Sequence, residues 1–125
     1  MQSALFNSIP EKDYFQLLPK GEPDGKKIVD LVRYRKEDVA TAANVPMPSV
    51  RYDQKMPEEL RERLIEWATA INLVANFFGN GEKAILWFQT PNPLLGNITP
   101  RDMIRVGRFK KLLKFVQTAL EENRR

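Results

Sequence analysis

The chain has 125 residues, 42% of them hydrophobic and 29% charged, and it contains neither cysteine nor histidine. This length and composition predict one compact domain, or a small domain with an arm. The two missing residue types exclude disulfides, zinc sites built from cysteine and histidine, and catalysis by serine–histidine or cysteine–histidine pairs. An enzyme of this composition would have to use carboxylates, lysines or tyrosines alone, and the candidate carboxylates Glu62 and Glu66, four residues apart on a long predicted helix, are better explained as its solvent face. We expect a protein that is not an enzyme, with no catalytic residue, no metal site and no cofactor.

The charge is unevenly distributed along the chain. The formal net charge is +4, and residues 101–125 hold eight basic and three acidic side chains, a net +5. Basic surfaces attract nucleic acid, anionic membranes and acidic protein faces, and charge alone does not choose among them. No apolar run reaches the roughly 20 residues of a membrane helix, and residues 1–6 lack the features of a secretory signal. We expect a cytoplasmic protein without a membrane partner.

Residues 1–25 are interrupted by prolines and glycines, so we expect an N-terminal arm there. A short helix near residues 11–18 that covers the core is the first interpretation. A flexible or partner-binding arm is the alternative. The apolar side chains available for docking are Phe6, Ile9, Tyr14, Phe15, Leu17 and Leu18.

Two short helical stretches, residues 26–34 and 35–43, precede a break at residues 44–48. Ala40, Asn44 and Val50 have the spacing of a helix-turn-helix: a small residue in the first helix, a turn residue that tolerates positive φ, and an apolar anchor in the second helix. Residues 26–56 are therefore predicted to be a helix-turn-helix-like DNA-binding unit. A helical corner that reads no DNA is the alternative.

The second helix of that unit would present a small polar surface to operator DNA. Arg51 suits a guanine edge, and hydroxyl and lysine side chains suit phosphates. Pro46 and Pro48 crowd the start of this helix, and Asp53 would repel phosphate. A single copy would bind weakly, so specific binding would need a dimer that presents two half-sites. The predicted DNA-binding residues are Met47, Ser49, Arg51, Tyr52 and Lys55.

The clearest predicted helix begins at Pro57 and runs for about 20 residues. Apolar residues recur at steps of three and four from Leu60 to Phe78, which predicts one buried stripe. Glu58 and Glu59 suit the positive end of the helix dipole. Gly79 is suited to the left-handed conformation that ends a helix.

Three further helical segments complete the chain. Residues 82–89 predict a short helix with Trp87 and Phe88 in the core. Thr99 can cap a helix whose first residue is Pro100, with the Asp102 carboxylate reaching back in a capping box. Gly107 separates this turn from a last helix whose lysines face solvent. Because no segment alternates with the period of a strand, the predicted fold is all-α, with six or seven helices in a compact unit.

The stretch from residue 84 to residue 107 resembles the C-terminal toxin-binding domain of the Xre/MbcA/ParS antitoxin family. That family's pattern is an alanine-plus-tryptophan helix, a Pro-Asn turn, Leu-Gly, Thr-Pro and a final glycine before the last helix. The matching residues are Ala84, Trp87, Pro91, Asn92, Leu95, Gly96, Thr99, Pro100 and Gly107. The resemblance implies a toxin-binding helical domain over residues 57–125, behind the helix-turn-helix-like unit.

The resemblance also implies a function. The partner would be a RES-domain toxin, an enzyme that degrades NAD⁺, and the antitoxin would neutralise it by covering its active site. It would also repress its own operon through operator DNA, as a homodimer or a hetero-oligomer with the toxin. A stand-alone helix-turn-helix regulator is the alternative. The expected toxin-binding residues combine the motif, the basic segment and the acidic chain end: Trp87, Pro91, Asn92, Leu95, Gly96, Thr99, Pro100, Arg101, Arg105, Glu121, Glu122 and Asn123.

Overall fold

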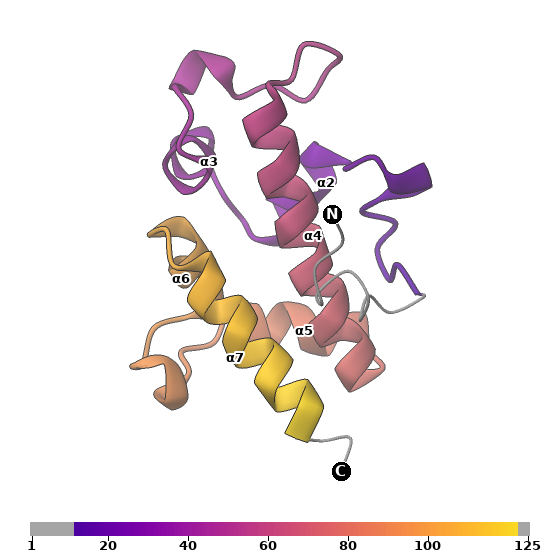
Figure 1. Cartoon of the computed structure of the whole chain (residues 1–125), viewed down its shortest axis with the longest axis vertical. Helices are drawn as coiled ribbons and strands as arrows, with labels where there is room; N and C mark the ends of the chain where they lie inside the picture. Colours follow the sequence, from indigo (N-terminus) through magenta and orange to yellow (C-terminus); the bar gives the residue numbers. More distant parts are fainter. Residues whose placement is uncertain (1–11, 123–125) are drawn as a thin grey trace.

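The computed structural model describes residues 12–122, and within that range the chain is helical and contains no strand. The predicted all-α fold is confirmed. The α-helices of this range, shown in Figure 1, are α2 (Gly25–Leu31), α3 (Lys36–Ala43), α4 (Glu58–Phe78), α5 (Gly81–Phe88), α6 (Pro100–Arg105) and α7 (Phe109–Glu122). Three single 3-10 turns lie between them: η1 (Pro19–Gly21), η2 (Met47–Ser49) and η3 (Pro93–Leu95). Among the described helices, none has the length and apolarity that a bilayer crossing requires.

Helix α4 is the axis of the molecule. Helices α2 and α3 pack against one part of it, and α5 and α7 pack against its C-terminal part (Figure 1). Residues 67–75 of α4 are all buried, which is the behaviour of a helix surrounded by other helices. The predicted end is confirmed, because Gly79 has φ 65° and caps α4 in the left-handed conformation. One hydrophobic core cluster includes residues on both sides of position 57, from Leu17 to Val116.

The N-terminal segment covers the core, but residues 12–18 do not form the expected helix. The Asp13 carboxylate accepts hydrogen bonds from the backbone N–H groups of Leu17 (2.9 Å) and Leu18 (2.8 Å). A side chain that takes backbone donors in this way competes with a helix for them. The segment still docks, since Leu17 is completely buried. Phe6 and Ile9 lie outside the described residues.

The predicted helix-turn-helix is only half present. Asn44 takes the left-handed conformation (φ 57°) at the end of α3, and Val50 is buried, as the motif predicts. The second helix is absent, however, and residues 47–49 form only the turn η2. The sequence explains this correction, because Pro48 has no N–H to donate and its ring clashes with the preceding helical turn.

Helix α6 begins as predicted, with the Thr99 hydroxyl accepting a hydrogen bond from the Asp102 N–H at 3.1 Å. The Asp102 carboxylate does not complete the expected capping box. It accepts instead from the guanidinium groups of Arg101 (3.3 Å) and Arg105 (3.2 Å). Gly107, with φ 86°, then reverses the chain into α7.

A candidate partner-binding groove

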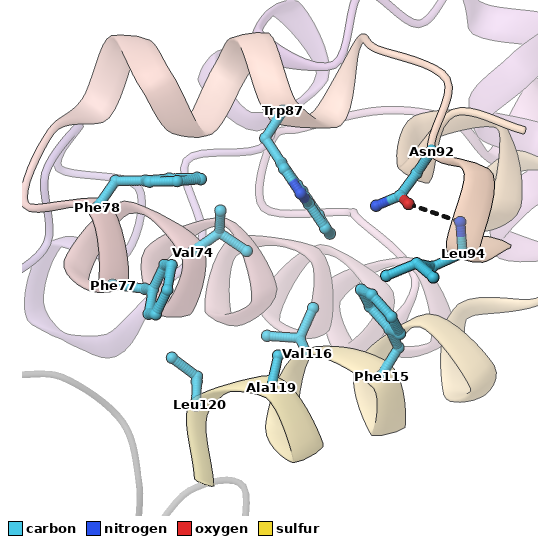
Figure 2. A pocket seen from close by; sticks show the side chains of 10 residues that line it. All are labelled: Val74, Phe77, Phe78, Trp87, Asn92, Leu94, Phe115, Val116, Ala119 and Leu120. Atoms are coloured by element: carbon cyan, nitrogen blue, oxygen red, sulfur yellow. Dashed lines mark hydrogen bonds between the residues drawn. The ribbon is translucent and has the colours of Figure 1, made fainter. Parts of the chain in front are cut away.

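An apolar groove opens where the C-terminal end of α4, the helix α5, the turn η3 and the helix α7 meet. Its volume is about 220 Å³. Figure 2 shows side chains from all four elements pointing toward one another across it. Almost all of them are apolar: Val74, Phe77, Phe78, Trp87, Asn92, Leu94, Phe115, Val116, Ala119 and Leu120. Concave apolar surfaces with few polar groups are typical of binding sites.

Trp87 forms a wall of this groove and is only half-buried. Its ring stacks on Phe115 of α7, with centroids 6.5 Å apart and planes 14° from parallel. It meets the edge of Phe88 at 5.1 Å. Phe88 lies in the core as predicted, whereas the core position expected for Trp87 is a surface position of the groove. The fully buried tryptophan of the chain is Trp67 on α4.

Three large apolar side chains at the rim are exposed. Leu94 is 79% exposed and Phe77 is 46% exposed, and Phe78 beside it is also exposed. Gathered apolar side chains at the surface mark interaction sites more often than scattered single ones. Sequence reasoning did not single out Phe77 or Leu94. The sequence does contain one sign of this exposure. Neighbouring residues of a helix point about 100° apart, so Phe77 and Phe78 cannot both lie on the buried face of α4.

Asn92 fixes the loop that carries Leu94. Its side-chain oxygen accepts from the Leu94 N–H at 2.9 Å (Figure 2). Its backbone carbonyl accepts from Leu95 and Asn97, both at 2.9 Å, and its N–H donates to Ile98 at 3.1 Å. The loop therefore holds one shape before any partner arrives, which lowers the entropy cost of binding.

The structure separates the predicted toxin-binding residues into two groups. Trp87 and Asn92 line the groove. Pro91 precedes Asn92, and the Leu95 N–H donates to the Asn92 carbonyl at 2.9 Å. Glu121 and Glu122 are exposed and follow the groove residue Leu120 at the end of α7. Gly96 ends η3 in the left-handed conformation. Asn123 lies outside the described residues.

The α6 residues of that set do not line the groove. Thr99 caps α6, and Pro100 is buried. Arg101 donates to the carbonyls of Val32 (2.7 Å) and Arg33 (3.0 Å) in the turn after α2. These contacts connect α6 to the N-terminal half of the chain.

A tyrosine completes this connection. The Tyr34 hydroxyl donates to the Arg101 carbonyl, and the Arg101 guanidinium lies 5.3 Å from the Tyr34 ring centre. Burial raises the pKa of Tyr34 above its ordinary range. Arg105 pairs with Asp102 on the same side of α6.

The predicted DNA-binding residues lie around η2 and the loop after it, and not on a helix. Arg51 donates to both carboxylate oxygens of Asp53, at 2.7 and 2.5 Å. These hydrogen bonds, with one from the Lys55 N–H, lower the pKa of Asp53 to about 2. Tyr52 packs its ring against Gly25, where an added Cβ would lie 2.5 Å from a ring carbon. Met47 and Lys55 are exposed, and Ser49 is partly buried.

Comparison with known proteins gives one family and one solved structure. A family model described as the antitoxin Xre/MbcA/ParS C-terminal toxin-binding domain matches residues 73–110. Among curated proteins, none matches this sequence. A chain in the crystal structure of the M. tuberculosis MbcT–MbcA toxin–antitoxin complex superposes with a TM-score of 0.48. The two sequences are 22% identical, and the match covers 78% of this chain and 90% of that chain. The described residues hold no group of three or more acidic side chains placed to bind a metal ion.

Proposed function

We propose that this chain neutralises a toxin protein by binding it through the groove, because residues 73–110 match the family model of the Xre/MbcA/ParS antitoxin C-terminal toxin-binding domain. The observation that supports this most is an overlap. The matched segment contains six of the ten groove residues, which lie at the end of α4, on α5, and in the loop from Asn92 through η3. The exposed rim of Phe77 and Leu94 would supply the apolar anchors that interface cores use.

We propose a RES-domain, NAD⁺-degrading toxin as the partner, with the antitoxin covering its active site in the cytoplasm. The family resemblance supports this choice. The charge at the end of α7 supports it further, since Glu121 and Glu122 follow the groove directly. An enzyme that binds a dinucleotide needs basic groups for its phosphates, and carboxylates placed at the cleft would pair with them. The antitoxin itself needs no catalytic group for this role.

We further propose that the chain represses its own operon by binding operator DNA as a dimer or in complex with the toxin. Its net charge of +4 supports contact with DNA. The missing second helix after Asn44 argues against readout from η2 alone.

Co-expression with a RES-domain toxin tests the main proposal. The wild-type chain should restore growth and the cellular NAD⁺ concentration. Leu94→Asp should abolish the rescue, because it puts a charge into the apolar rim without touching the core. Leu86→Asp is the matched control, since Leu86 is also exposed (65%) but does not line the groove. Failure of the wild-type chain to rescue growth, or equal rescue by both variants, would contradict the proposal.

A further inference from the structure

The first half of α7 and the residue before it carry a set of unpaired cations, which we call the α7 basic face. Its members are Arg108, Lys110, Lys111 and Lys114. All four are exposed, and none forms an ion pair with another residue in the range 12–122. The sequence has no aspartate or glutamate between Asp102 and Glu121. By contrast, the exposed Arg51 and the partly buried Arg61 are each held by a carboxylate.

The positions of these cations do not stabilise the fold. The N-terminal end of a helix is the positive end of its dipole, so cations in the first turn of α7 are disfavoured there. Lys110 and Lys114 are also one turn apart, an arrangement in which like charges repel. Helix α4 shows the opposite arrangement, with Glu58 and Glu59 in its first turn. Cations that weaken their own helix and meet no internal partner point to an anionic partner outside the chain.

We infer that the α7 basic face binds the phosphate backbone of duplex DNA. This inference deepens the repressor part of the proposed function and does not depend on the toxin. Lysine is depleted at the cores of protein interfaces, whereas protein–DNA interfaces are much more positively charged. Lys110 and Lys114 lie about 6 Å apart along the helix, so the face presents a row of point charges to the backbone.

The location of the face is compatible with simultaneous toxin binding. A hollow of about 590 Å³ lies beside the first turn of α7 and is lined by Arg108, Lys110 and Lys111. Arg63 and Glu66 of α4 also line it and pair with each other at 2.8 Å, so they add no net charge. The groove uses the other end of α7, from Phe115 to Leu120. Figure 1 shows α7 running from α6 toward the C-terminus, so the two sites occupy successive parts of one helix. A toxin seated in the groove would leave the basic face available to DNA.

The test is the salt dependence of binding to a fluorescent DNA duplex of about 30 base pairs, measured by anisotropy with the full chain. If the four cations each neutralise one phosphate, the slope of log K against log salt is about −3.6. Affinity then falls about 150-fold between 50 and 200 mM salt. The triple variant Lys110→Gln, Lys111→Gln, Lys114→Gln keeps one phosphate contact. Its affinity should therefore fall only about 3.5-fold over the same range of 50 to 200 mM salt.

A matched triple variant removes the same charge from other exposed sites: Lys26→Gln, Lys36→Gln, Lys83→Gln. It should keep the wild-type slope, and circular dichroism should show both variants folded. Equal slopes for the two triple variants would overturn the inference. The inference would also be overturned if the double variant Arg51→Gln, Lys55→Gln lost more DNA affinity than the α7 triple variant, because that result would place DNA at η2 and the loop after it.

Two other outcomes separate this inference from the proposed function. If wild-type DNA affinity survives in the α7 variant while toxin association slows, the face meets an acidic protein surface, and the inference is overturned. If the wild-type chain binds no DNA at 50 mM salt, the inference and the repressor role both fail. Toxin neutralisation, tested by Leu94→Asp, would stand independently of either result.

Discussion

The two tryptophans of the chain should respond very differently to truncation. Trp67 is 1% exposed on α4 and meets the edge of the Tyr34 ring at 5.8 Å. Emptying such a site costs about 3–5 kcal/mol. Trp87 is half-buried, and one side of it already faces the groove, so Trp87→Ala should cost roughly half as much. At about 4 °C per kcal/mol for a chain of this size, Trp67→Ala should lower Tm by about 12–20 °C and Trp87→Ala by about 6–10 °C.

Thermal unfolding followed by circular dichroism measures the decrease in Tm of each variant, and a urea titration gives the free energies of unfolding. Toxin affinity is then measured at a temperature where both variants are folded. There, Trp87→Ala should weaken binding and Trp67→Ala should not. Equal destabilisation by the two variants would place Trp87 in the core and refute the groove wall as described. Unchanged toxin affinity in Trp87→Ala would refute the groove as the binding site.

Three further predictions follow from single side chains. In a Trp67→Phe variant, Trp87 is the one remaining tryptophan, and its fluorescence emission should shift to shorter wavelength when toxin fills the groove. Arg101→Gln should lower the free energy of unfolding by about 2 kcal/mol, because two backbone carbonyls lose a charged donor. Arg105→Gln, at a more exposed position, should change it by less than about 0.5 kcal/mol in the same urea titration. The raised pKa of Tyr34 means that the folded state holds this proton more tightly than the unfolded state. The contribution of the Tyr34 proton to the free energy of unfolding is therefore complete below pH 10. It is lost as the pH rises toward the pKa of Tyr34 in the folded state. Tyr34→Phe should show a shallower loss of unfolding free energy above pH 10, and identical slopes would contradict this.

Local signals in the sequence predicted the regular elements well. The apolar stripe from Leu60 to Phe78 gave the length of α4, and Gly79 gave its end. Thr99 and Pro100 gave the start of α6. These features depend on residues within one or two turns of each other, and a single sequence contains that information.

The errors arose where a side chain competes with the backbone or where two distant segments meet. Asp13 takes the donors that a helix over residues 12–18 would need. Pro48 limits the expected second helix to the turn η2. The groove depends on Trp87 stacking on Phe115, residues from two helices that are separated by a loop and α6. No local pattern reports such a pairing, so the sequence indicated the segment that matches the toxin-binding family without indicating the groove.

Arg101 shows why the motif and the surface are not the same set of residues. It lies in the segment that matches the toxin-binding domain, yet its guanidinium is bound to the turn after α2. Asn92 likewise lines the groove chiefly because it shapes the loop under Leu94. Residues of this kind hold the scaffold, whereas Phe77 and Leu94 expose apolar side chains at the rim of the groove. A match to the motif therefore supports the kind of partner, and the exposed rim of the groove is where the identity of that partner should be decided.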